Sequence, residues 1–393
     1  MTPAARVQAA VELLDQVIEA ARGGGAAADT LIARYFNDRR YAGSGDRRAV
    51  RELVYAAIRR SGDRPSTGRA ALLGLADDRP ELLALFDGSP HGPAAIGGEE
   101  NKVPAGVTPA WLRPRFDPLI DEAEQRALLD RAPLDLRVNR NKGDREAARA
   151  ALPEAEPTPL SPLGLRLPEG FRVDGTQAWR SGLVEVQDEG SQLLALACQA
   201  RPGATVVDLC AGAGGKTLAL AAEMGNQGRI VAADTDRGRL SAMTPRLARA
   251  GVGIVEPRLL NPGREREMLA DLSGAADLVL VDAPCSGSGT WRRNPETRWR
   301  LTPERLERLV ALQAQLLELA AELVRPGGTL VYAVCSLLAE EGRAQADRFG
   351  AIHSAWVSEP TAMLGGRAAG PGRVLTPAHD GTDGFFVARW RAP

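Results

Sequence analysis

The stretch that most constrains the fold is TVVDLCAGAGGK, at residues 205–216. An apolar run ends there in a glycine-rich turn, and the helical pattern TLALAAEMG follows directly. Glycines at 212, 214 and 215 let the backbone turn sharply and come close to a ligand. The next apolar run, RIVAADTD, ends at Asp234, where a doubly wound fold places an acid against a ribose. The pattern predicts a nucleoside site; the alternative is a plain tight turn between strand and helix.

The spacing of this turn narrows the choice of cofactor. Gly-Ala-Gly-Gly-Lys matches neither the dinucleotide fingerprint nor the phosphate-binding loop, which keeps four residues between its first glycine and its Gly-Lys-Ser/Thr end. A nucleoside cofactor without a phosphate chain still needs close backbone approach and an acid for its ribose. S-adenosylmethionine fits that description, so we expect it as the cofactor.

Composition bounds the class of protein. The chain has 393 residues, 44% of them hydrophobic, which is enough for two or three domains with their own cores. No apolar run reaches the roughly 18 residues of a membrane span, and the first residues lack the apolar region of a signal peptide, so we expect a cytoplasmic protein. Four cysteines without a Cys-x-x-Cys pair, and histidines without metal spacing, argue against a metal site. The net charge of −1 means that any nucleic acid must bind a local patch.

Periodicity divides the chain into three predicted domains. Residues 1–90 carry amphipathic helical patterns at 4–22, 28–38 and 46–60 and predict a small all-α domain, followed by a Pro- and Gly-rich linker. Residues 105–187 mix short helices with strands at LDLRVN, GLRL and GLVEVQ, and predict a small α+β unit. In residues 188–393 strands alternate strictly with helices, as in a parallel sheet with helices on both faces. The fold class is therefore α/β, with a doubly wound main domain.

Two cysteines follow buried strands. ADLVLVDAPCSGSG places Asp282 and Cys285 just past one strand end, and GTLVYAVCS delivers Cys335 at another. Ligands of open α/β sheets bind beyond the carboxyl ends of the strands, so neighbouring strands would bring both thiols to one crevice beside the cofactor. Cys198, on a helix, and Cys210, inside the turn, are interpreted as small packed residues.

Methylation of a pyrimidine carbon is a reaction that would use these thiols. Cytosine C5 is too weak a nucleophile to attack a sulfonium methyl group, so a thiolate first adds to C6. A carboxyl group such as that of Asp282 would meet the charge arriving at N3 by sharing a proton. The C5 proton is then removed and the thiol expelled, a step that a second thiol could assist.

Four motifs in order carry a family resemblance: DLCAGAGGKT, VDAPCSGSGTWRRNPETRW, LVYAVCS and DGFFVARW. They resemble the RsmB/NOP (NOL1/NOP2/Sun) family of RNA cytosine-C5 methyltransferases over about residues 105–393. The N-terminal helices, with YAGSGDRRAVRELVYAAIRR, resemble the NusB-like RNA-binding domain of bacterial members. The resemblance implies a Rossmann-like, S-adenosylmethionine-dependent methyltransferase domain, a small RRM-like unit before it, and RNA, most directly 16S rRNA, as partner and substrate.

The resemblance also assigns roles to residues. The nucleophile falls on Cys335, the cysteine of product release on Cys285 and the active-site acid on Asp282, whereas the Pro-Cys pair of DNA cytosine methyltransferases would make Cys285 the nucleophile. The acid for the ribose falls on Asp234, and Asn261 stands where the family has an aspartate near the adenine. The cofactor loop, which lacks the family's usual proline, maps to Cys210, Ala211, Gly212, Ala213, Gly214, Gly215 and Lys216, with Asp282 beside it.

Between the two cysteines, TWRRNPETRWR interleaves arginine with tryptophan, a composition that suits phosphates and unstacked bases. We therefore predict RNA contacts at Trp291, Arg292, Arg293, Arg298 and Trp299, against the alternative of a structural loop that packs its tryptophans into a core. Two rival functions stay open. The altered cofactor loop and Asn261 favour a non-catalytic RNA-binding assembly factor, and the Pro-Cys pair leaves a DNA methyltransferase possible.

Overall fold

The computed structural model describes residues 1–393, which form two compact units. The first unit joins residues 1–116, 121–130 and 290–303, and the second joins 117–120, 131–289 and 304–393. This division differs from the three predicted domains in two respects. The small α+β region from residue 131 on shares a unit with the large sheet, and residues 105–116, 121–130 and 290–303 belong with the N-terminal helices.

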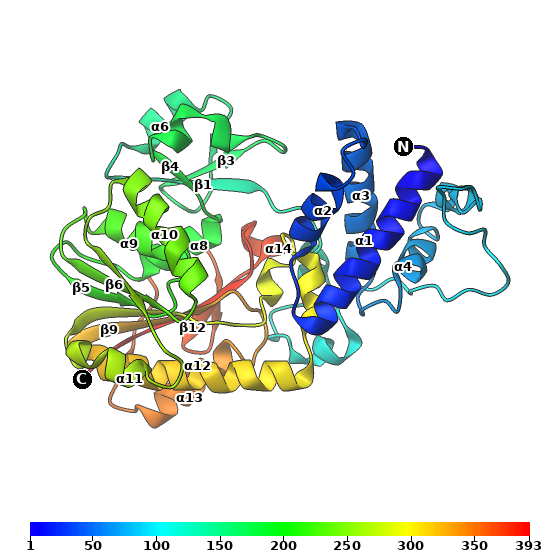
Figure 1. Ribbon diagram of the computed structural model, residues 1–393. Helices are drawn as coiled ribbons and strands as arrows, with labels where there is room; N and C mark the ends of the chain where they lie inside the picture. The colour runs from blue at the N-terminus through cyan, green and yellow to red at the C-terminus, as the bar shows by residue number, and fades with distance from the viewer. The chain divides into compact units, whose positions relative to one another are not determined.

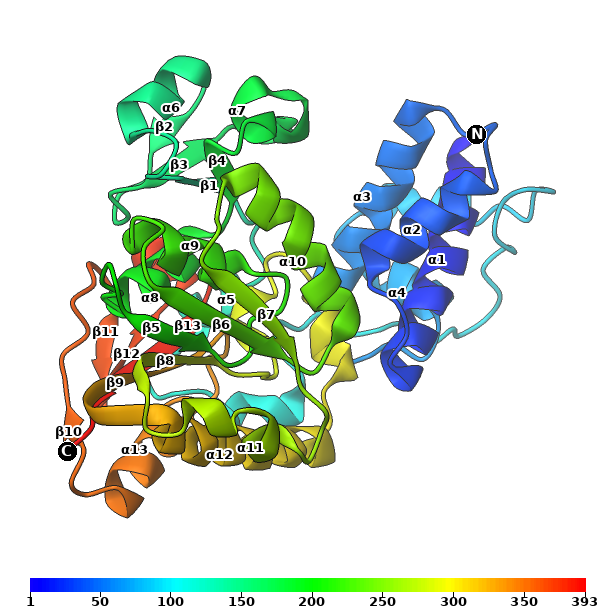
Figure 2. The same cartoon turned by 60° about the vertical axis from the view of Figure 1, so that its left-hand side comes forward.

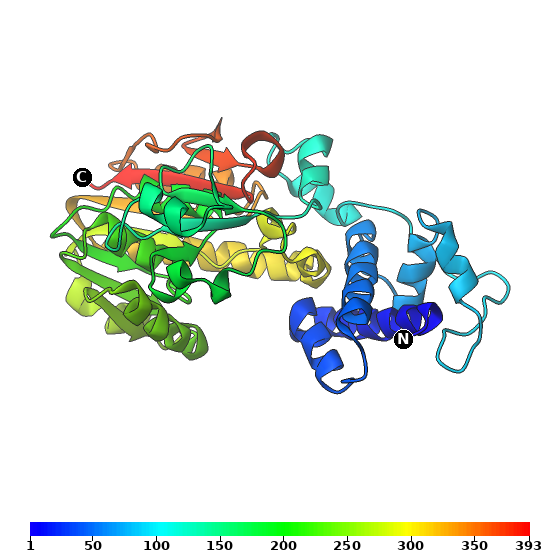
Figure 3. The ribbon, with the colours of Figure 1, turned by 90° about the horizontal axis from the view of Figure 1, so that it is seen from above.

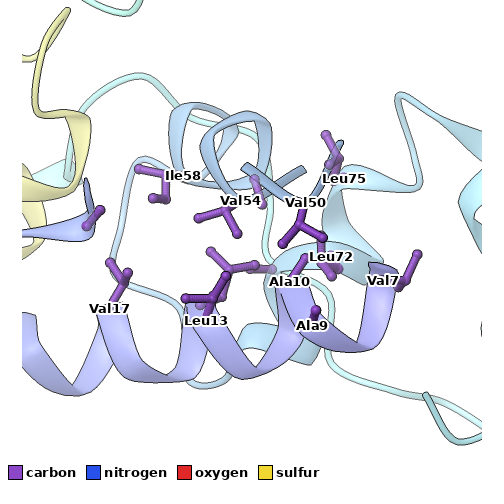
Figure 4. Packing of buried hydrophobic residues seen from close by; sticks show 14 of the residues in the cluster. Val7, Ala9, Ala10, Leu13, Val17, Val50, Val54, Ile58, Leu72 and Leu75 are labelled. Atoms are coloured by element: carbon purple, nitrogen blue, oxygen red, sulfur yellow. The ribbon is translucent and has the colours of Figure 1, made fainter. Parts of the chain in front are cut away.

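The first unit is built on the helix α1 (Pro3–Gly23), drawn in blue in Figure 1. Thr2 caps its start by accepting a hydrogen bond from the backbone of Ala5, and Gly24, at a φ of 74°, ends it. Its apolar face packs on α3 (Ser44–Arg60) and α4 (Gly68–Leu75), where Leu13 faces Val54 (Figure 4). The remaining elements of the unit are α2 (Ala28–Asn37), η1 (Pro80–Leu85), η2 (Ala110–Arg115), α5 (Glu122–Ala127) and η6 (Pro295–Arg300).

The second unit begins with a small antiparallel sheet of four strands in the order β2-β3-β1-β4. Leu136 of β1 lies opposite Leu165 of β3, and both side chains are buried under the helix α6. Asp144 caps α6 by accepting from the backbone of Ala147. The elements are β1 (Leu134–Val138), α6 (Arg145–Ala151), β2 (Glu156–Pro157), β3 (Gly164–Leu167), η3 (Val173–Gly175), α7 (Gln177–Arg180) and β4 (Val184–Val186).

The large sheet has nine strands, eight of them in the order β11-β12-β13-β9-β8-β5-β6-β7, with β10 (Val357–Ser358) paired to β13. The strands β7, β6, β5, β8 and β9 run parallel, as the alternation of strands and helices predicts. Their bounds are β5 (Thr205–Asp208), β6 (Arg229–Asp234), β7 (Val255–Leu259), β8 (Ala276–Asp282) and β9 (Val324–Val334).

The expectation of a strictly parallel sheet is wrong for the C-terminal strands, so the sheet is mixed. β13 (Phe385–Arg391) lies antiparallel to β9 and to β12 (Gly372–Leu375), which pairs with β11 (Arg367–Ala369). The short connection at residues 376–384, with α14 (Pro377–Asp380), leaves no room for the crossover of about a dozen residues that parallel strands need. Figure 3 shows β13, in red, beside the strands of the same sheet.

Helices cover both faces of the large sheet (Figures 1 and 2). α8 (Glu189–Ala197), α9 (Gly215–Glu223) and α10 (Arg237–Ala250) lie on one face, and α11 (Glu265–Met268), α12 (Pro303–Leu323) and α13 (Arg343–Ile352) lie on the other. A short turn, η4 (Ala270–Leu272), precedes β8. No helix is both long and apolar enough to cross a membrane. The arrangement is a Rossmann-like α/β fold that gathers the carboxyl ends of β5, β6, β8 and β9 at one edge.

Candidate active site

A cavity of about 710 Å³ opens at this edge, within the second unit. Its size lies in the range of small-molecule sites. Among the predicted residues, its lining includes Cys210, Ala211, Gly212, Ala213, Gly215, Lys216, Asp234, Asp282, Cys285 and Cys335. A larger hollow, about 990 Å³, lies in the first unit around Tyr35 and Arg39, but neither a thiol nor a glycine-rich turn lines it.

The glycine-rich turn is fixed to the end of β6. The carboxylate of Asp234 accepts from the backbone nitrogens of Gly212 and Asp236, both at 2.8 Å, and Ala211 donates to the carbonyl of Ala233 at 3.0 Å. Gly212 and Gly214 take φ values of 55° and 82°, which residues with a β-carbon rarely adopt. The turn therefore depends on glycine at these two positions.

The lining fits a nucleoside cofactor. No other part of the chain lies closer than 3.9 Å to where a β-carbon of Gly212 would stand, and none lies within 4 Å at Gly215, so the backbone there is open to a ligand. Asp234 still has free lone pairs for ribose hydroxyls. Asn261 is not among the residues that line the cavity, whereas its neighbour Leu260 is.

A lysine and a carboxylate form an ion pair in the wall of the cavity. Lys216 Nζ, at the start of α9, lies 2.7 Å from Oδ2 of Asp282, the last residue of β8. Burial alone would lower the pKa of Lys216, but the Asp282 carboxylate outweighs it and raises that pKa above its usual value. The site thus holds a fixed positive charge against a carboxylate that faces the cavity.

The two cysteines predicted to share a crevice do meet. Cys285 Sγ and Cys335 Sγ are 3.3 Å apart, because β8 and β9 are neighbours and pair Asp282 with Ala333. The hydrogen bond with Cys335, together with burial, raises the pKa of Cys285 well above its usual value. Cys198 is packed in the core as predicted, and burial raises its pKa to about 12.

The predicted RNA contacts need correction, because four of the five side chains are buried: Trp291, Arg292, Arg298 and Trp299. Arg298 donates to the carbonyls of Ile58 and Ser61 at the end of α3, and Trp299 Nε1 donates to Ser61 at 2.9 Å. A buried ring cannot stack on a base. This segment is a structural anchor within the first unit, and Arg293 is the one predicted contact that is partly exposed.

Several lining residues were missed by the sequence analysis. Gln187 and Ser191 lie at the start of α8, where Gln187 Nε2 donates to Ser191 Oγ at 3.1 Å and its Oε1 accepts from Arg137 at 2.6 Å. Three leucines of α12 also line the cavity, and their spacing by three and four residues places them on one face of the helix: Leu309, Leu312 and Leu316.

Comparison with known proteins places these features in a family. The family described as 16S rRNA methyltransferase RsmB/F matches residues 195–391. A "Probable ribosomal RNA small subunit methyltransferase B" of Synechocystis is 37% identical over 299 residues, which cover 71% of this chain and 66% of that protein. The ribosomal RNA small subunit methyltransferase B of Sodalis glossinidius is 33% identical over 331 residues, or 79% of this chain and 73% of that protein.

Solved structures agree on the fold. A methyltransferase homologue from Pyrococcus horikoshii is 29% identical, with a TM-score of 0.60 over 68% of this chain and 89% of that one. NSun6 from the same organism, solved with SFG, has a TM-score of 0.64 at 20% identity over 72% of this chain and 98% of that one. The structure of PH0851 has a TM-score of 0.76 at 24% identity over 99% of both chains. The chain belongs to the RsmB/F family of 16S rRNA methyltransferases.

Proposed function

We propose that this protein transfers a methyl group from S-adenosylmethionine to C5 of a cytosine in 16S rRNA, through a covalent bond between Cys335 and C6. One observation carries the proposal. Two thiols lie 3.3 Å apart in a cavity that the glycine-rich turn also lines, together with the ion pair of Lys216 and Asp282. Attack on a pyrimidine ring needs this combination of nucleophile, acid and adjacent cofactor.

S-adenosylmethionine, when bound, supplies an electrophilic methyl group. The residues of the turn would hold its nucleoside, with the Asp234 carboxylate accepting from the ribose hydroxyls and the bare backbone at Gly212 and Gly215 lying against the ligand. The apolar side chains of α12 would exclude water from the opposite side.

Different side chains of the protein act on the base at successive steps. The Cys335 thiolate adds to C6, and negative charge moves to N3, which takes a proton that the Lys216 ammonium group supplies through the Asp282 carboxylate. Lys216 Nζ lies 2.7 Å from that carboxylate, within hydrogen-bond distance. After methylation water takes the C5 proton, the electron pair of that C–H bond forms the C5–C6 double bond, and the C6–sulfur bond breaks to release the Cys335 thiolate. Cys285 keeps its proton because its pKa is raised, so its thiol can donate a hydrogen bond to the departing sulfur of Cys335.

The same proposal assigns RNA recognition outside the cavity. We assign residues 1–90 to a NusB-like RNA-binding domain, 105–187 to an RRM-like unit and 188–393 to the methyltransferase domain. The helical packing of α1, α3 and α4 supports the first assignment, and the four-stranded antiparallel sheet with α6 supports the second.

A transfer assay tests the proposal. Purified protein, S-adenosylmethionine labelled in its methyl group and unmodified 16S rRNA should place label in 5-methylcytosine, and unlabelled DNA should not compete. The assembly-factor alternative predicts that the protein binds RNA without transferring label. If the protein is a DNA methyltransferase, unlabelled DNA should compete and reduce the label found in the RNA. Absence of label from 5-methylcytosine under conditions where the RNA binds would refute the proposal.

A further inference from the structure

A buried carboxylate lies behind the two thiols, and nothing in the proposed chemistry uses it. Glu341 stands in the turn between β9 and α13 and is fully buried. No cation pairs with it, and all its hydrogen-bond donors are neutral. An ionised carboxylate without a counter-ion is costly to bury unless hydrogen bonds satisfy its oxygens. The burial of this carboxylate therefore needs a specific explanation.

The donors to Glu341 come from the two turns that carry the cysteines. From the first turn, the backbone nitrogen of Ser286 donates to Oε1 at 2.8 Å, and the Ser286 hydroxyl donates to Oε2. From the second turn, the Ser336 hydroxyl donates to Oε2 at 2.6 Å. Ser286 follows Cys285 directly, and Ser336 follows Cys335 directly. One carboxylate thus bonds the residue next to each thiol.

Other bonds fix the carboxylate itself. Gln313 Nε2, from α12, donates to Glu341 Oε1 and to the carbonyl of Pro284, both at 2.9 Å. The hydroxyl of Tyr332 donates to the backbone carbonyl of Glu341 at 2.6 Å. Ser288 reinforces the link between the turns, since its hydroxyl accepts from the backbone of Leu337 at 2.9 Å. These groups form one connected hydrogen-bond network, which favours one arrangement of its members.

We propose that Glu341 is a positioning residue, whose carboxylate clamps the turn after Cys285 to the turn after Cys335 and thereby sets the approach of the two thiols. The expected effect of the clamp on methyl transfer rests on the proposed function, whereas its expected effect on the geometry of the two thiols does not. The negative charge of Glu341 also adds to the effects that raise the pKa of Cys285, so the clamp helps to keep that thiol protonated.

Two variants test the clamp. Glu341→Gln replaces an acceptor by an amide that donates where Ser286 and Ser336 also donate, and Ser336→Ala removes one arm with little change in shape. Asp380→Asn is the matched control, because Asp380 is also buried and accepts from two backbone nitrogens, those of Gly366 and Thr376, but lines no part of the cavity. Thermal unfolding of all three variants measures any general loss of stability.

The first readout needs no catalysis. The oxidant diamide should join Cys285 and Cys335 in a disulfide, with both thiols losing a proton and two electrons passing to the diamide, which becomes the hydrazine. Loss of free thiols, mapped by mass spectrometry, should be slower in Glu341→Gln and Ser336→Ala than in the wild type and unchanged in Asp380→Asn. Equal rates in all four proteins, or equal slowing in Asp380→Asn, would overturn the clamp.

The second readout is methyl transfer. A misplacement of reacting groups by about 1 Å costs on the order of 100-fold in rate, so kcat should fall by up to about 100-fold in Glu341→Gln, while the KM for S-adenosylmethionine stays near that of the wild type. A rise in KM at unchanged kcat would contradict the role. If the wild type transfers no methyl group but the variants still differ in disulfide closure, the proposed function fails and the clamp stands.

Discussion

Three neighbouring glycines of the cofactor turn allow a graded prediction. At Gly214 the φ of 82° costs a residue with a β-carbon ~1–2 kcal/mol, and that carbon would lie 2.6 Å from Cγ of Met243, an overlap worth about 1–3 kcal/mol. Since the Met243 side chain can yield, Gly214→Ala should lower the free energy of unfolding by about 2–3 kcal/mol. At Gly212 no atom lies closer than 3.9 Å to the position of a β-carbon. Gly212→Ala should therefore lower the free energy of unfolding only by the cost of the positive φ, about 1 kcal/mol.

Gly215 supplies the control. It opens α9, has no positive φ, and no atom lies within 4 Å of its β-carbon position, so Gly215→Ala should raise stability by about 0.5 kcal/mol. Equilibrium urea unfolding followed by circular dichroism measures the series, and calorimetric titration with S-adenosylmethionine shows whether the strained turn also loses affinity. Three values within about 0.5 kcal/mol of one another, or Gly215→Ala as the most damaging change, would refute the reasoning.

Three shorter predictions concern the two cysteines, Lys216 and Asp208. Cys335→Ala should abolish turnover, and Cys285→Ala should trap a covalent RNA adduct on a denaturing gel; an adduct with the first variant and none with the second would reverse the two roles. Lys216→Met removes the cation beside Asp282 and should lower the single-turnover rate about 100-fold without unfolding the protein, so a wild-type rate would exclude Lys216 from the chemistry. Burial raises the pKa of Asp208 to about 7, so between about pH 4 and 7 the native state holds a proton that the unfolded chain has released. Wild-type stability should therefore fall relative to Asp208→Asn as the pH rises through that window in urea unfolding, and parallel pH profiles would contradict this.

The parallel part of the fold was predictable because each of its strands is a short apolar run with a turn signal and a helix after it. The C-terminal strands were not predicted as strands, although FFVARW has the apolar and aromatic composition of one. Whether two consecutive strands pair in parallel or antiparallel depends on the length of their connection, and the short connection at residues 376–384 makes β12 and β13 an antiparallel pair.

The site was predictable where its residues follow strand ends, and unpredictable where it depends on distant partners. Asp234, Asp282, Cys285 and Cys335 all fall just at or past the carboxyl ends of parallel strands, and neighbouring strands bring them together. Glu341 gave no signal, because a glutamate in a turn before a helix is ordinarily solvated. Its burial follows from hydrogen bonds to two turns, one of them 55 residues away.

The segment at 290–303 shows why its arginines and tryptophans were wrongly predicted to contact RNA. The last carbonyls of a helix carry partial negative charge, so a guanidinium suits them for the same reason that it suits phosphate oxygens. Arg298 takes this place at the end of α3, and Trp299 buries its ring and satisfies its N–H on Ser61. The segment begins only five residues after Cys285, yet its partners lie in the N-terminal helices. Without those helices Arg298 and Trp299 would lose the carbonyls to which they donate, so the fold of this segment depends on the N-terminal helices of its own unit.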